Sequence, residues 1–210
     1  MGKIRDYFSA MGNAFLLWRK PSRLTDADML AAFCLQQASY VAQTTLYGYL
    51  RTRAGLQHFN LFTDKKFVAV LKPARTRLVL VCLDDLTVYA AAKMPELSAP
   101  RRARLAAALY AQAIADLADR DLPQAELATA QKDFEARSQA IDWAARAAPG
   151  KSIAAFRKSA EALIELAPIV DDLKKYDDEI VTNSMHFKWL EVRAQLRARL
   201  DAHALLASLT

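Results

Sequence analysis

Apolar and polar residues alternate with a helical period over the first twenty residues of the chain. When successive residues are placed about 100° apart, the large apolar side chains gather on one face and the polar ones on the other. The apolar face consists of Ile4, Tyr7, Phe8, Met11, Ala14, Phe15 and Trp18. Pro21 then ends the segment, because proline lacks the N–H that a helix interior requires. The pattern predicts a basic amphipathic helix within residues 1–23, ahead of an α-helical domain over residues 24–210.

A second helical pattern covers residues 26–54. Thr25 and Asp28 have the spacing of a capping box with Thr25 as the N-cap, and Gly55 is a typical C-terminal cap. The stripe between them contains Met29, Leu30, Phe33, Gln37, Tyr40, Val41, Thr44, Tyr47 and Leu50. We therefore expect one long helix, followed by a loop over residues 56–63.

The segment after this loop admits two interpretations. A short helix from Asp64 to Leu71 would end before Pro73, and a helical stripe of apolar residues follows it. Alternatively, residues 67–91 would form a small β-meander with Asp84-Asp85 as a tight turn. We favour helix, because the flanking segments are helical and the apolar stripe is regular.

The rest of the chain reads as helices that begin or end at serine, proline or glycine. The expected ranges are 98–120, 123–148, 152–166 and 169–209, with a break in the last one near residues 182–184. The stripe of the last segment consists of Val181, Met185, Trp189, Val192, Leu196 and Leu200. Only five of the 210 residues are glycine, which also favours helices. The predicted fold class is all-α, a multi-helix bundle of about six to eight helices.

Composition indicates a globular protein, with 53% hydrophobic and 25% charged residues. The two cysteines, Cys34 and Cys82, lie among apolar residues without metal or redox spacing, so we expect free thiols in a reducing compartment. The longest purely apolar run, Leu78–Leu83, is too short to span a bilayer. A cytoplasmic protein, peripheral at most on the inner face of the cytoplasmic membrane, is the resulting expectation.

The net charge of +6 is concentrated near the N-terminus. Residues 1–23 carry five basic side chains and one acidic side chain, a local net charge of +4. Basic residues beside exposed aromatic ones are typical of helices that lie on anionic membranes or partner proteins. The predicted docking residues are Lys3, Arg5, Tyr7, Phe8, Met11, Phe15, Trp18, Arg19 and Lys20. Packing of the same aromatic face onto the protein's own domain is the alternative.

Catalytic motifs are missing from the sequence. The histidines at 58, 186 and 203 stand apart, with no Glu-x-x-His spacing to suggest a metal helix. Neither a glycine-rich phosphate loop nor a Gly-x-Ser-x-Gly elbow occurs. We expect a non-catalytic protein that has no cofactor and no metal.

Acidic residues cluster between Asp171 and Glu179, and a second set comprises Asp116, Asp119 and Asp121. Facing aspartate-rich helices that bind Mg²⁺ and diphosphate are the arrangement of isoprenoid synthases, so an Mg-dependent diphosphate-binding helical enzyme is one alternative function. The spacing differs from the motif of those enzymes. Because lysines are interspersed, a solvated, salt-bridged helix face is the favoured interpretation.

Residues 29–70 loosely resemble the DNA-binding half of tetracycline-repressor-type regulators. The counterparts are Thr44-Thr45, Ala54-Gly55 and the aromatic-basic stretch Phe62–Lys66. The resemblance implies an all-α transcriptional regulator, the other alternative function. Against it, the helix that contains the threonine pair lacks the turn that the motif needs, and few basic residues follow.

Five arginines form a candidate anion-contact stripe, namely Arg75, Arg77, Arg101, Arg102 and Arg104. Those near a helix N-terminus oppose the helix dipole, which is consistent with an external anion, although solubility explains them equally well. The sequence as a whole favours a protein partner. An anionic membrane surface and a homodimer are also compatible with it, and nucleic acid is the least favoured partner.

Overall fold

A computed structural model describes residues 22–117, 121–148 and 154–209 of the chain. The described residues form helices and contain no β-strand, which confirms the all-α prediction. They form more helices than the six to eight expected, because short helices occupy segments predicted as loops or as parts of longer helices. The expected N-terminal helix lies outside the described residues.

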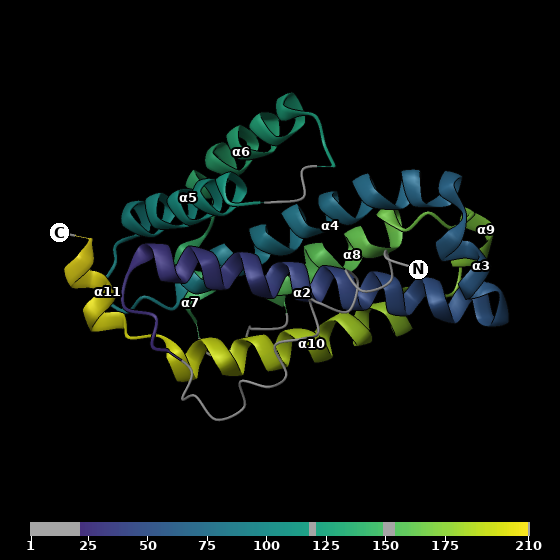
Figure 1. Cartoon of the computed structure of the whole chain (residues 1–210). Helices are drawn as coiled ribbons and strands as arrows, with labels where there is room; N and C mark the ends of the chain where they lie inside the picture. The colour runs from purple at the N-terminus through teal and green to yellow at the C-terminus, as the bar shows by residue number, and fades with distance from the viewer. Residues whose placement is uncertain (1–21, 118–120, 149–153, 210) are drawn as a thin grey trace.

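Helices α2 (Ala27–Ala54) and α4 (Lys65–Ala92) are the two long helices at the centre of the bundle (Figure 1). Asp26, rather than Thr25, is the N-cap of α2, because its carboxylate accepts a 2.8 Å hydrogen bond from the N–H of Met29. Gly55 ends α2 with a φ of 52°, as its predicted capping role requires.

The connection from α2 to α4 is helical, so the predicted loop over residues 56–63 is wrong. A 3₁₀ turn, η2 (Gly55–Gln57), leads into α3 (His58–Thr63). The half-buried Phe62 holds α3 in place, since its ring lies 5.5 Å from the ring of Tyr47 on α2. Asp64 then caps α4 by accepting from the N–H of Lys66.

Helix α4 confirms the helical interpretation of residues 67–91 and corrects the predicted break at Pro73, which lies inside the helix. The proline deprives the carbonyl of Ala69 of its donor, but Ala69 is exposed and water can bond it. Leu71, Ala74 and Leu78 are buried on both sides of Pro73. Packing of this continuous stripe therefore outweighs the cost of the proline.

The next helices cover α4 (Figure 1); the first ends earlier than predicted, at Ala115, and the last ends at Leu166 as predicted. They are α5 (Ala99–Ala115), α6 (Gln124–Gln139), α7 (Trp143–Ala147), η3 (Ala154–Phe156) and α8 (Arg157–Leu166). The predicted helix over residues 123–148 is divided because Asp142 caps α7 through the N–H of Ala145. Trp143 is buried at this break, and its Nε1–H donates to the carbonyl of Ser138 at 3.1 Å.

The predicted helix over residues 169–209 is also divided, into α9 (Asp171–Lys174), α10 (Asp178–Arg199) and α11 (Ala202–Ser208). Residues 182–184, where a break was expected, lie within α10. The chain breaks instead at Leu200, whose backbone is extended and forms a parallel bridge with Leu24. Asp201 then caps α11 through the N–H of Ala204.

One hydrophobic core joins these helices, with α4 at its centre. Trp189 of α10 is fully buried; its ring stacks on Phe156 with the centroids 4.4 Å apart, and its Nε1–H donates to Ser159 Oγ. Cys34 and Cys82 are buried free thiols, as predicted. Among the described residues, no helix is long and apolar enough to cross a membrane.

Candidate docking surface

Helix α10 has one buried apolar face, and on the opposite side it exposes large apolar residues together with Asn183 and Glu191. The stripe predicted from the sequence is the buried face, and Val181, Met185, Trp189, Val192 and Leu196 are all buried. Ile180 and Phe187 are each 72% exposed on the other side, and Leu190 is 47% exposed. Ala194 and Ala198 continue this line toward the C-terminal end of the helix and are exposed as well. We call these five exposed residues the outer face of α10.

The outer face is unusual because a helix on the surface of a globular protein normally presents polar residues to water. Large apolar side chains that share a face indicate an interaction site more often than scattered ones do. Three further large side chains, Val170, Leu173 and Tyr176, are exposed in the segment that leads into α10. Exposed apolar residues therefore concentrate in this part of the chain.

Polar contacts hold the start of α10 against α2. Asp177, directly before α10, accepts hydrogen bonds of 2.6 Å from Tyr49 Oη and from Arg53 Nε. The hydrogen bonds from Arg53 hold the pKa of Asp177 below its ordinary value, whereas burial and the neighbouring carboxylate raise the pKa of Tyr49 to about 12. Asp177 is therefore a structural anion, and the outer face has a well-defined position on the bundle.

Two further cations fix the middle of α10 to neighbouring aromatic rings. Lys188 Nζ lies 5.2 Å from the ring centre of Tyr40 and donates to its hydroxyl. Arg193 lies over the ring of Tyr89, 5.7 Å from its centre. Both side chains extend toward the bundle, so they leave the outer face free of their charge.

The described chain begins at the other end of α10. The N–H of Leu24 donates to the carbonyl of Arg199 at 2.9 Å, and the N–H of Asp201 donates to the carbonyl of Leu24 at 3.0 Å. Arg199 Nε also donates to the carbonyl of Ser22. Ser22 and Leu24 are therefore held beside the last turn of α10.

The predicted docking residues themselves lie outside the described residues. They are Lys3, Arg5, Tyr7, Phe8, Met11, Phe15, Trp18, Arg19 and Lys20. The prediction that they dock on a partner or membrane stays a prediction.

The arginines of the candidate anion stripe lie near the two opposite ends of α5. Arg75 pairs with Asp121 at 2.8 Å, and Arg77 forms a bidentate pair with Glu126 of α6. At the start of α5, Arg102 donates to the carbonyl of Met94. Arg101 and Arg104 are exposed there beside a shallow hollow. Arg75 and Arg77 are thus engaged with carboxylates, and the stripe does not form one continuous surface.

A buried acidic pair on α4 is the polar feature that sequence reasoning missed. The sequence suggested Asp84-Asp85 only as a tight turn between strands, but both residues lie within α4 and both are buried. Asp84 pairs with Arg137 of α6 and, at 2.6 Å, with Lys158 of α8. A cleft of about 360 Å³ opens beside these cations, between α6 and α8. The sequence signal for this pair was two adjacent carboxylates within a long apolar run, since buried carboxylates require polar partners.

Asp85 connects α4 to α8. Its carboxylate accepts a 2.8 Å hydrogen bond from the backbone N–H of Ser159 in the first turn of α8. Burial, and to a lesser degree the charge of Asp84, raise its pKa to about 7. The pair joins α4 to α6 and α8 through Asp84 Oδ2 and Asp85 Oδ2, whereas the buried Oδ1 of Asp84 has no hydrogen-bond partner among the described residues.

The acidic clusters form ion pairs and a hydrogen bond within the described residues. Asp171 pairs with Lys174 at 3.0 Å, Asp116 accepts from Gln112, and Asp121 pairs with Arg75. Within the part of the chain that the structure describes, no group of three or more potential ligand residues could hold a metal ion. These contacts match the solvated, salt-bridged interpretation of the clusters.

The segment that resembles a repressor DNA-binding motif has no internal turn. Helix α2 continues through Thr44 and Thr45, and both hydroxyls donate to backbone carbonyls one helical turn earlier. The turn between helices comes only at Gly55, and α3 has six residues.

Comparisons with protein-family models, with curated proteins and with solved structures each found no match.

Proposed function

We propose that the protein is a non-catalytic interaction, assembly or regulatory protein. Its docking element is the basic aromatic segment over residues 3–20, which attaches to a protein partner or to the inner face of the cytoplasmic membrane. The observation that carries the proposal is the tether of Ser22 to Arg199 at the end of α10. Ser22, the first described residue, thus lies at the end of a helix that exposes large apolar residues.

The chemistry of the segment supports this function. Phe8, Phe15 and Trp18 supply apolar area on one helix face, and basic residues flank it at both ends. Each basic residue contributes about 1 kcal/mol near an anionic lipid surface. A single helix of this kind binds reversibly, which suits an accessory or regulatory protein.

Sedimentation with vesicles tests the membrane arm of the proposal. The full chain is mixed with phosphatidylglycerol-containing vesicles and with purely zwitterionic vesicles, and bound protein is measured. We expect binding to anionic vesicles that falls with salt, and its loss in the triple variant Phe8→Ser, Phe15→Ser, Trp18→Ser. Phe59→Ser, which changes a 74% exposed aromatic residue on α3, is the matched control.

Capture from native lysate with the same variants tests the partner arm. A specific protein that is retained by the full chain and by Phe59→Ser, but lost by the triple variant, supports partner docking. If the triple variant keeps both vesicle binding and every captured protein while circular dichroism shows it folded, the proposed function is wrong.

A further inference from the structure

The cleft beside Asp84 is lined mainly by faces of α4, α6 and α8. Asp84 belongs to α4, Arg137 to α6 and Lys158 to α8, and the other lining positions on each helix recur every three or four residues. The volume of about 360 Å³ suits a small organic molecule, since such sites usually measure about 300–1,000 Å³. The cleft is therefore built from regular helix surfaces and is large enough to hold a ligand.

Asp84 has one carboxylate oxygen to which no described residue donates. Its Oδ2 accepts from Arg137 and, at 2.6 Å, from Lys158, whereas the buried Oδ1 has no hydrogen-bond partner among the described residues. Asp84 is only 5% exposed, and an unpaired acceptor at such a depth is costly. A ligand that brings an N–H donor into the cleft would remove this cost.

Arg137 and Lys158 have more donors than Asp84 uses. A guanidinium carries five N–H groups and an ammonium carries three. The side chains of Arg137 and Lys158 are 39% and 48% exposed, so their remaining donors are accessible. Two positive charges against one carboxylate also leave an excess positive charge among these three side chains. This part of the cleft therefore favours a carboxylate on the ligand.

An aromatic pair and aliphatic side chains form an apolar wall of the cleft. The rings of Tyr110 and Phe134 stack with their centroids 4.1 Å apart, and both residues line the cleft together with Leu80 and Val81. Burial, and then the charge of Asp84, raise the pKa of Tyr110, so its hydroxyl stays protonated and can donate. An apolar side chain on the ligand would contact this wall.

Two further carboxylates line the cleft. Asp133 on α6 and Glu165 on α8 are both exposed. Arg77 and Glu126, in contrast, neutralise each other in their bidentate pair. Groups of both signs therefore face the cleft. A ligand with a single charge would be attracted by one set and repelled by the other, so a ligand that carries both charges is favoured.

We propose that the cleft binds a free α-amino acid with an apolar side chain. The ammonium group of the ligand donates to Asp84 Oδ1, its carboxylate accepts from Arg137 and Lys158, and its side chain packs on the apolar wall. The two half-exposed cations turn toward the ligand carboxylate and so admit the ammonium group to the buried oxygen. Such a site is independent of the docking proposed above.

Isothermal titration calorimetry with the full chain at pH 7 tests the proposal. L-Phenylalanine and L-leucine carry both charged groups, 3-phenylpropionate lacks the ammonium group, and 2-phenylethylamine lacks the carboxylate. We expect saturable binding of an amino acid and at least about tenfold weaker binding of both analogues, because each loses a charge-assisted hydrogen bond. If neither amino acid binds, or if either analogue binds as tightly as L-phenylalanine, the proposal is wrong.

A variant that fills the cleft shows where the amino acid binds. Ala130 lines the cleft on α6, and Ala130→Leu occupies part of it without changing an ion pair. Ala128 is exposed on the same helix, so Ala128→Leu is the matched control. We expect Ala130→Leu to weaken amino-acid binding about tenfold or more through steric overlap, and the control to leave it unchanged. Equal affinity in the two variants would contradict the assigned site.

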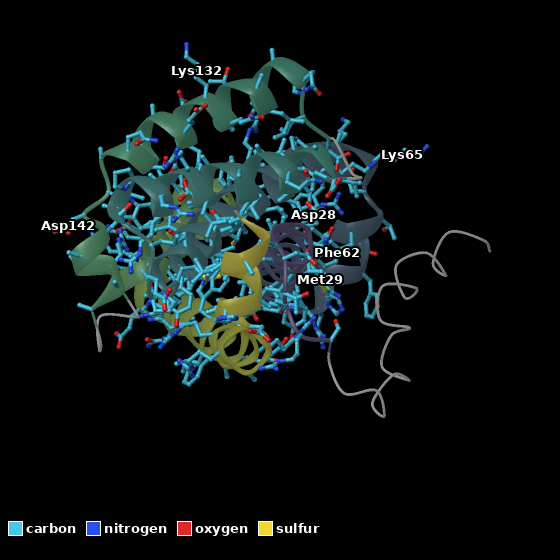
Figure 2. The ribbon with its side chains drawn as sticks, turned by 90° about the vertical axis from the view of Figure 1, so that its left-hand side faces the viewer. Asp28, Met29, Phe62, Lys65, Lys132 and Asp142 are labelled. Carbon is cyan, nitrogen blue, oxygen red and sulfur yellow. The ribbon has the colours of Figure 1, made fainter. Side chains whose placement is uncertain are left out.

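A charge variant tests the contact with the ligand carboxylate. Arg137→Gln removes a cation from the cleft, whereas Lys132→Gln removes one that extends from α6 away from the bundle (Figure 2). We expect Arg137→Gln to weaken binding of L-phenylalanine but not of 2-phenylethylamine, which has no carboxylate. Lys132→Gln should change neither. Equal losses for the two ligands, or for the two variants, would contradict the contact.

Discussion

The backbone N–H of Ser159 donates to the buried carboxylate of Asp85, so the first turn of α8 is capped by a side chain of α4. The two residues are 74 positions apart in the chain. Burial raises the pKa of Asp85 to about 7 despite this hydrogen bond, so the buried carboxyl group makes the stability of the bundle depend on pH near neutrality.

The first prediction concerns that pH dependence. Between about pH 4, where an unfolded aspartate titrates, and pH 7, the folded protein retains a proton that the unfolded chain releases. The free energy of unfolding should therefore fall as the pH rises through this window and level off above it. From pH 5 to pH 8 the loss from Asp85 amounts to about 2–3 kcal/mol.

Urea unfolding of the Asp85→Asn variant at pH 5 and pH 8 measures this contribution. The amide oxygen of asparagine still accepts from Ser159 but does not ionise, so the difference between the two pH values should shrink. Asp133→Asn, an exposed carboxylate on α6, is the control and should keep the pH dependence of the parent chain. An unchanged difference in Asp85→Asn would exclude the residue as its source.

The second prediction concerns Trp189, which anchors α10 to α8. Trp189→Ala should lower the free energy of unfolding by about 3–5 kcal/mol, because it removes a fully buried ring and leaves a cavity. Trp189→Phe keeps the stacking on Phe156 but loses the hydrogen bond to Ser159, and should cost about 1 kcal/mol beyond the change in volume. Urea unfolding measures both. Phe59→Ala, at an exposed ring, should stay within about 0.5 kcal/mol; equal losses at the two sites would contradict the assigned core.

The third prediction uses the two described glycines of the α2 region. Gly55 has a φ of 52°, where a side chain is strained, so Gly55→Ala should destabilise the protein by about 1–2 kcal/mol. Gly48 lies inside α2 with no atom within 4 Å of an added Cβ. Gly48→Ala should therefore stabilise the protein by about 0.5–1 kcal/mol. Thermal unfolding should move in opposite directions for the two variants, and a shift in the same direction would contradict the cap geometry.

The fourth prediction concerns Pro73. Pro73→Ala restores a donor for the carbonyl of Ala69 inside α4. Alanine also gives the unfolded chain more conformational entropy, which offsets part of this gain. The free energy of unfolding should therefore rise by about 1–2 kcal/mol. Pro100, in the first turn of α5, sits where a helix needs no donor. Pro100→Ala should therefore change stability by less than about 0.5 kcal/mol. A loss of stability in Pro73→Ala would contradict the assigned cost of the missing donor.

Helical periodicity identified α2 and the buried face of α10 because each is a single stripe on a regular helix. It failed at Pro73, because local propensity does not include the packing of residues on both sides of the proline. It also failed at Asp84 and Asp85, since their partners, Arg137, Lys158 and Ser159, come from distant segments.

The exposed apolar residues of α10 could have been predicted from the sequence, but they were missed. Ile180 and Phe187 are seven residues apart, and Leu190 follows three residues later, which is a second helical stripe. The stronger stripe through Trp189 had already accounted for the helix. The predicted N-terminal docking segment, in contrast, has one apolar stripe and no competing pattern.

The bridge between Leu24 and Leu200 also has a mechanical consequence. A target that held the N-terminal segment and pulled on it would load the two backbone hydrogen bonds of Leu24 before it loaded α2. These bonds join the chain to the junction of α10 and α11, so traction would reach the C-terminal helices first. The hydrogen bonds at this junction would therefore break before force applied at the docking segment reached α2 and α4.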